Sequence, residues 1–233
     1  MITENVHIVK EKIAEICKNS GRNPGEITLI AVSKTNPISA IEEAVSAGIT
    51  DLGENKAQEL RDKSKLIEGD FNWHFIGHLQ TNKVKYVIRA AEYIHSVDSV
   101  KLAEEINRKA ETLDKVQKIL IEVNTSGEES KYGIQDFDSL ESLIEKCETL
   151  SNIEVKGLMT MAPFTSDEDV IRKCFINLRE MKEKLNNRWD NITELSMGMT
   201  NDYKIAIEEG STMLRIGTAI FGQRDISKSW REK

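Results

Sequence analysis

Apolar and polar positions along the chain change in blocks that predict short buried strands alternating with amphipathic helices. The run from Ile27 to Val32 is typical of the strands, because it is short, rich in β-branched residues and lacks strict alternation. Pro37 prevents the strand from continuing, since proline has no N–H to give to a ladder. The predicted strands are residues 27–32, 49–52, 72–76, 93–97, 118–123, 153–158, 193–196 and 213–216.

Helices are predicted where apolar residues recur at the three- and four-residue spacing of one helical face. A first helix over residues 5–19 precedes the first strand, and Gly21 and Pro24 end it. The chain from Gln223 onward is charged, and we expect it to be solvated. The other predicted helices are residues 38–48, 56–67, 83–91, 100–113, 135–150, 168–185 and 200–210, with a terminal turn or helix at 217–222.

This alternation of strand and helix predicts the fold class. Parallel strands need crossover connections, so repeated strand–helix units indicate a parallel sheet with helices on the outside. Eight such units in 233 residues predict an α/β protein with a closed (β/α)₈ TIM barrel and an additional N-terminal helix. A doubly wound open sheet is the alternative. Because no linker rich in Pro, Gly or Ser divides the chain, residues 1–233 are expected to form a single domain.

Composition narrows the class of protein. A hydrophobic content of 39% is enough for a sizeable core, and no apolar window has the length that spans a bilayer. The net charge of −7 argues against nucleic-acid binding through a basic face. Cys17, Cys147 and Cys174 fall on apolar helical stripes, which predicts buried free thiols in a reducing compartment. With no export signal at the start, we expect a cytoplasmic protein without membrane contact.

Lys34 directly follows the first predicted strand. In a barrel, the loops after the strands share one rim, where barrel enzymes carry their chemistry. Partial burial there favours the neutral, nucleophilic amine. The alternative is a lysine that turns out to solvent, which is the commoner case for a single lysine at a strand end. The same rim would hold Asn55, His78 and Met161.

The loops after the seventh and eighth strands form a candidate phosphate site. They contain Ser196 to Thr200 and Gly217-Thr218, and barrels commonly bind phosphate at this place. Thr200 would supply a hydroxyl and its own N–H, while Gly217 and Thr218 would supply backbone N–H groups. Alternatively, Thr200 is only an N-cap and Gly217 only a turn glycine.

Arg215 lies inside the last predicted strand, where a buried guanidinium must find an acceptor. Two interpretations are open: a structural ion pair with Glu122 or Glu194, or an orientation toward a ligand. A metal site is not expected, because His74 and His78 have no carboxylate or cysteine to complete a ligand set. Motifs for dinucleotides and nucleoside triphosphates are also missing from the sequence.

A lysine at a strand end, a phosphate site and an inward arginine together fit pyridoxal 5′-phosphate. The lysine would form an internal aldimine with its aldehyde, the hydroxyl and N–H groups would hold its phosphate, and a polar residue would meet its pyridine nitrogen.

Motifs along the chain resemble those of the pyridoxal phosphate homeostasis protein family, in order from about residue 30 to 222. These motifs are Ala31-Val32-Ser33-Lys34-Thr35, Gly53-Glu54-Asn55, Trp73 to Gln80, His95-Ser96-Val97-Asp98-Ser99, Val123 to Glu128, Gly157 to Met161, Leu195 to Met199 and Gly210 to Gly217. The resemblance implies the fold of the barrel domain of alanine racemase.

The resemblance also implies roles for individual residues. Lys34 would be the Schiff-base lysine, and Arg215 would face the pyridine nitrogen. Lys131 corresponds to an arginine near the phenolic oxygen of the cofactor. The phosphate would be held by Thr200, where serine is usual, and by Gly217 and Thr218. The implied cofactor-binding set is Lys34, Asn55, Met161 (where a ring-stacking histidine would be), Ser196, Thr200, Arg215, Gly217 and Thr218.

This family implies a role in vitamin B6 and amino-acid homeostasis, without catalytic turnover. An arginine keeps the pyridine nitrogen unprotonated and so weakens the ring as an electron sink. The chain is also expected to lack the second domain from which racemases take a catalytic tyrosine, and to be a monomer. Its partners would be pyridoxal phosphate and apo-enzymes that require it. The alternatives are a racemase-type enzyme with an unknown substrate and, with less support, a barrel that binds phosphorylated sugars.

Overall fold

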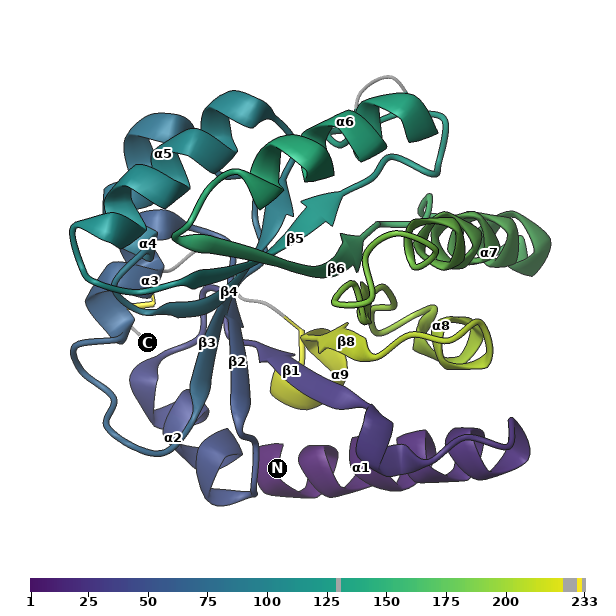
Figure 1. Ribbon diagram of the computed structural model, residues 1–233. Coiled ribbons are helices and arrows are strands. Elements are labelled where there is room, and N and C mark those ends of the chain that lie inside the picture. Colours follow the sequence, from purple (N-terminus) through teal and green to yellow (C-terminus); the bar gives the residue numbers. More distant parts are fainter. Residues whose placement is uncertain (129–130, 224–229, 232–233) are drawn as a thin grey trace.

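The computed structural model describes residues 1–128, 131–223 and 230–231. All neighbouring strands are parallel, and β8 pairs with β1 to close the barrel (Figure 1). The predicted (β/α)₈ barrel is therefore confirmed, and the open sheet is excluded. The strands are β1 Thr28–Val32, β2 Asp51–Glu54, β3 Asn72–Phe75, β4 Ala91–Val97, β5 Gln117–Glu122, β6 Ile153–Met159, β7 Glu194–Ser196 and β8 Met213–Ile216.

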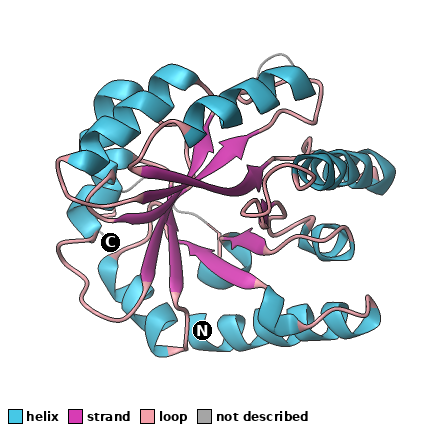
Figure 2. Ribbon diagram, in the orientation of Figure 1, coloured by secondary structure: helices cyan, strands magenta, loops and turns pink. Residues whose placement is uncertain are grey.

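Helices surround the barrel, as Figure 2 shows. The predicted extra helix is present as α1, which precedes the first strand and packs against the last helices of the chain. Short 3₁₀ turns occur at Pro24–Glu26 and Thr81–Lys83. The helices are α1 Ile2–Asn19, α2 Ile38–Ser46, α3 Ala57–Lys63, α4 Val84–Val87, α5 Val100–Glu111, α6 Phe137–Glu148, α7 Glu168–Leu185, α8 Tyr203–Glu208 and α9 Thr218–Phe221.

Several predicted helices extend too far, and the one expected over residues 56–67 ends at Lys63. The helix expected over residues 83–91 is reduced to the single turn α4, because Ala91 already pairs with Trp73 as the first residue of β4. The helix expected over residues 200–210 begins only at Tyr203, since the preceding turn is held by a hydrogen bond from the Met199 amide to Asp202. Sheet pairing and a side-chain hydrogen bond in the preceding turn decided these two boundaries rather than helical periodicity.

In the C-terminal segment, which was expected to be solvated, Arg231 is exposed but Trp230 is half-buried. Lys63 Nζ lies 5.4 Å from the centre of the Trp230 ring, and Arg231 forms an ion pair with Asp62. Residues 224–229 and 232–233 lie outside the described part of the chain. At Trp230 and Arg231 the chain therefore contacts α3.

Most of the core lies between the helices and the outer face of the barrel. The three cysteines are free and buried in α1, α6 and α7, as predicted. Inside the barrel, a smaller apolar cluster contains Ile30, Leu120, Met159 and Met213. Within the described residues, no helix combines the length and the apolar character that crossing a membrane requires.

A buried ionic cluster holds the loop that follows β1. The Lys63 side chain is fully buried, and its Nζ lies 2.7 Å from a carboxylate oxygen of Glu54 and 2.7 Å from one of Glu59. Lys63 also donates to the backbone oxygen of Ser33 at 2.9 Å, and the Ser33 hydroxyl donates to Glu54 at 2.7 Å. The cluster thus fixes the residue immediately before Lys34.

The residue after Lys34 is fixed by the same cluster. Thr35 has a φ of 64°, and its amide donates to Glu59 at 2.7 Å. A β-branched residue in the left-handed region is strained and persists only where its surroundings enforce it. The residues on both sides of Lys34 are therefore held in place by Lys63 and its carboxylate partners.

Replacing Lys63 with methionine is expected to destabilise the fold strongly, because two buried carboxyl groups lose their cation. The free energy of unfolding should fall by about 3–5 kcal/mol, as measured by urea denaturation. Lys65→Met, at an exposed position two residues away, is the matched control and should change stability by less than about 0.5 kcal/mol. Equal effects of the two substitutions would contradict a structural role for the cluster.

The cluster also predicts how stability depends on pH. Burial raises the pKa of Glu54 from 4.5 to about 7, opposed by Lys63 and reinforced by Glu59. Since the folded protein then keeps a proton that the unfolded chain releases near pH 4.5, stability falls as pH rises between these values. Glu54→Gln cannot titrate at this position. Between roughly pH 4.5 and 8, its free energy of unfolding should therefore fall by about 2–3 kcal/mol less than that of the wild type. Urea unfolding measures both slopes, and parallel slopes would refute the prediction.

Candidate functional site

A cavity of about 280 Å³ opens where the carboxyl ends of the strands meet their loops. This is toward the small end of the range for ligand pockets, roughly 300–1,000 Å³. It is built largely from residues that are distant in sequence but lie at or after the carboxyl ends of β1, β2, β3, β6, β7 and β8. Its lining includes seven of the eight predicted site residues: Lys34, Asn55, Met161, Thr200, Arg215, Gly217 and Thr218.

Arg215 forms a buried, charged part of the cavity wall. One Nη of its guanidinium donates to Ser196 Oγ at 2.5 Å, and the other donates to the Thr160 backbone oxygen at 2.9 Å. Burial lowers its pKa to about 10, while Asp202 and Glu122 act in the opposite direction. The group therefore stays protonated at neutral pH and presents a cation to the cavity.

The contacts of Arg215 distinguish a structural ion pair with Glu122 or Glu194 from an orientation toward a ligand. Neither predicted carboxylate partner hydrogen-bonds to it within the described residues: Glu194 accepts from the Thr212 hydroxyl at 2.6 Å, and Glu122 acts only through its charge. Its structural partners are a serine hydroxyl and a backbone oxygen instead. Since the side chain also lines the cavity, orientation toward a ligand is the interpretation that the geometry supports.

Ser196 is the one predicted site residue that does not line the cavity. It is the last residue of β7, and its side chain is fully buried in the barrel. Its hydroxyl accepts the hydrogen bond from Arg215, so it lies behind the guanidinium as seen from the cavity. The sequence placed Ser196 correctly at the end of the seventh strand but could not show which way the side chain points.

The loops after β7 and β8 contact each other at Thr200, whose hydroxyl accepts from the Ala219 amide at 3.4 Å. The β7 loop requires a glycine at position 198, where φ is 98° and an added Cβ would lie 2.5 Å from the Ala206 Cβ. The hydroxyls of Thr200 and Thr218 and the backbone at Gly217 therefore share one wall of the cavity. Hydroxyl and amide donors of this kind suit an anionic group.

Asn55 contributes an unsatisfied acceptor to the cavity. Its Oδ1 is buried and has no hydrogen-bond partner among the described residues. Gly77 packs so closely against the Asn55 backbone that an added Cβ would lie 2.2 Å from its carbonyl oxygen. Because buried polar atoms are rarely left without a partner, this oxygen is suited to accept from a bound ligand.

Two residues singled out in the sequence do not line the cavity. Lys131 Nζ donates to the Ala162 backbone oxygen at 3.1 Å and pairs with Glu128 at 3.2 Å, so it supports the loop that carries Met161. His78 stacks on Tyr132, with ring centres 3.8 Å apart.

The structure adds lining residues that were not expected from the sequence, and none of them lies in a chemically distinctive motif. Asp202 is the charged one among them, and burial raises the pKa of its carboxyl group. Phe164 is 96% exposed at the edge of the cavity. The only signal in the sequence was their position directly after predicted strands. The missed polar and aromatic residues are Phe164, Thr165, Asn201 and Asp202.

Comparisons with known proteins agree with this geometry. The model of the alanine racemase N-terminal domain family matches residues 7–225. A pyridoxal phosphate homeostasis protein of Aquifex aeolicus is 41% identical over 223 residues, covering 95% of this chain and 97% of that relative. A protein of the same name from Haemophilus influenzae is 40% identical over 235 residues, covering 98% of each chain.

Solved structures extend the similarity. PipY of Synechococcus elongatus, with PLP bound, has a TM-score of 0.84 at 32% identity, covering 95% of this chain and all of that one. An alanine racemase of Clostridium difficile has a TM-score of 0.74 at 16% identity, covering 95% of this chain and 62% of that one, which shows a shared fold alone. By its motifs, barrel and full-length relatives, the chain belongs to the pyridoxal phosphate homeostasis protein family.

Proposed function

We propose that this protein holds pyridoxal 5′-phosphate in the cavity at the carboxyl ends of its strands, attached covalently to Lys34. The observation that carries the proposal is that an amine, a guanidinium and two hydroxyls line one small cavity from separate strand ends. PipY, which is 32% identical over nearly the full chain, has been solved with PLP bound.

Each of these groups has a partner on the cofactor. The bound cofactor supplies an electrophilic aldehyde on an aromatic ring, and the primary amine of Lys34 can condense with this aldehyde and release water. The hydroxyls of Thr200 and Thr218 can donate to phosphate oxygens, and Arg215 can donate to an unprotonated pyridine nitrogen. The unsatisfied Asn55 Oδ1 remains for a donor of the ligand.

The proposal includes a role in cofactor homeostasis without turnover. Arg215 remains cationic at neutral pH because its pKa is about 10, and a donating guanidinium leaves the ring nitrogen unprotonated. Carbanion chemistry on a bound amino acid is then poorly stabilised. A racemase-type enzyme is the second candidate, and the match to the alanine racemase N-terminal domain family favours it. The monomeric state, the cytoplasmic location and delivery to apo-enzymes stay predictions.

Lys34→Ala tests the attachment. Wild-type protein incubated with pyridoxal phosphate and freed of excess ligand should show a visible absorption band, which should be lost in the variant. Borohydride reduction followed by peptide mass spectrometry should find the cofactor on Lys34. Lys101→Ala, at an exposed position of α5, is the matched control and should keep the band. A colourless wild type, or equal labelling of Lys34→Ala, would refute the proposed attachment.

Exchange of amino-acid α-protons in deuterated water separates the two candidate functions. The loaded wild type, tested by NMR on a panel of amino acids, should exchange protons no faster than the same concentration of free cofactor, because the ring is a weak electron sink. Lys34→Ala provides the background. Stereospecific exchange well above free cofactor with any amino acid would instead support the racemase-type enzyme.

A further inference from the structure

A chain of hydrogen bonds runs from the cavity wall through the inside of the barrel. Arg215 donates to Ser196 Oγ at 2.5 Å, and Ser196 Oγ lies 2.9 Å from His95 Nδ1. His95 Nε2 lies 2.9 Å from His74 Nδ1, and His74 Nε2 lies 2.9 Å from Asp51 Oδ1. The five residues come from β8, β7, β4, β3 and β2, and all are buried.

The direction of this chain follows from counting donors and acceptors. A guanidinium can only donate, so Ser196 Oγ accepts from Arg215. The remaining partner of the Ser196 hydroxyl is His95 Nδ1, so this ring nitrogen must be the acceptor if the hydroxyl proton is to be satisfied. The Nδ1 of His95 therefore carries no proton. Burial holds the pKa of His95 well below its ordinary value, which agrees with a neutral ring.

The two histidines pass this direction on to Asp51. A neutral His95 without a proton on Nδ1 carries it on Nε2 and donates to His74 Nδ1. His74 then has its proton on Nε2 and donates to the carboxylate of Asp51. The chain has a cation at one end, a carboxylate at the other and two neutral histidines of one tautomer between them.

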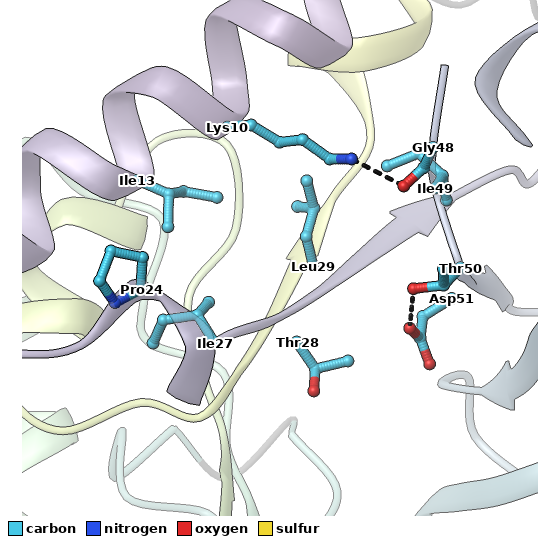
Figure 3. Close-up of a pocket in the computed structure, with 10 residues that line it drawn as sticks. All are labelled: Lys10, Ile13, Pro24, Ile27, Thr28, Leu29, Gly48, Ile49, Thr50 and Asp51. Atoms are coloured by element: carbon cyan, nitrogen blue, oxygen red, sulfur yellow. Dashed lines mark hydrogen bonds between the residues drawn. The ribbon is translucent and has the colours of Figure 1, made fainter. Parts of the chain in front are cut away.

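Asp51 is well placed to hold the end of the chain. Burial acts to raise the pKa of its carboxyl group, but hydrogen bonds from His74, Thr50 and Asn72 bring the pKa below its ordinary value. Asp51 also lines a second cavity, of about 340 Å³, at the amino-terminal end of β1 and β2 (Figure 3). There Thr50 Oγ1 donates to the Asp51 carboxylate at 2.7 Å. The chain thus connects opposite ends of the barrel.

We propose that Asp51, His74 and His95 are positioning residues that orient the Ser196 hydroxyl to accept from Arg215. The carboxylate at one end of the barrel thereby sets the guanidinium at the wall of the cofactor cavity at the other end. The inference rests on the proposed function only in taking that cavity as the place where the ligand binds.

The Asp51 carboxylate reinforces the direction that Arg215 sets at the other end, because a carboxylate can only accept. An asparagine at this position can donate to His74 Nε2, which allows both histidines to adopt the opposite tautomer. His95 Nδ1 would then donate to Ser196, whose oxygen would accept from two donors. The hydroxyl proton would be buried without an acceptor, and the contact with Arg215 would weaken.

Nitrogen-15 NMR of the full chain without cofactor tests the tautomers directly. In the wild type, His74 and His95 should each show a protonated Nε2 and an unprotonated Nδ1 near neutral pH. In Asp51→Asn the His95 signals should move toward the opposite tautomer. Glu154→Gln removes a carboxylate from a partly exposed position near the start of β6 and should leave the His95 signals unchanged. Retention of the wild-type tautomer in Asp51→Asn would overturn the proposal.

Cofactor affinity tests the consequence for the cavity. Asp51→Asn should bind pyridoxal phosphate about three- to tenfold more weakly, although residue 51 does not line the cavity that holds Lys34. Ser196→Ala, which removes the link next to Arg215, should weaken binding similarly and covers the case that Asp51→Asn does not fold. Unchanged affinity in folded Ser196→Ala would overturn the proposal. A wild type that binds no cofactor would refute the proposed function instead, while the NMR experiment would still decide the tautomers.

Discussion

The burial of the Arg215 guanidinium is the constraint on which the interior of this barrel depends. A charge removed from water must be matched by acceptors, and the barrel supplies them from the ends of β6 and β7 rather than from a carboxylate in direct contact. Because Ser196 accepts from Arg215 and its own buried hydroxyl proton also needs an acceptor, the requirement extends to His95 and beyond. One buried cation therefore accounts for polar residues on several strands.

A second buried cation has a local role. Lys63 carries no chemistry of its own, but it holds the residues on both sides of Lys34 through Glu54, Glu59 and the Ser33 backbone. A flexible lysine side chain is more useful as an attachment point when its backbone does not move. The rim of the barrel thus combines one buried cation that lines the cavity and one that fixes the loop carrying Lys34.

The sequence predicted the parts of this site that follow from position along a strand. Lys34 and Thr200 lie in the loops that follow β1 and β7, and the carboxyl ends of barrel strands meet at one rim, so chain order alone was enough to predict that they lie close together. Helix boundaries were less predictable. Ala91 fits the apolar spacing of the preceding helix, but in the structure it pairs with Trp73 as part of β4. Ser196 was placed correctly at the end of the seventh strand, but the direction of its side chain depended on Arg215.

By itself, the sequence determined the number of strand–helix units and most of the predicted residues at the rim, whereas the pairing of β8 with β1 decided that the sheet closes. The units and the rim residues follow from periodicity and chain order, which are local properties. Only the tertiary structure decided that Asp51, His74, His95, Ser196 and Arg215 form one connected chain. These residues come from five strands, and their contacts depend on barrel register and on side-chain direction across the interior, which no local pattern encodes.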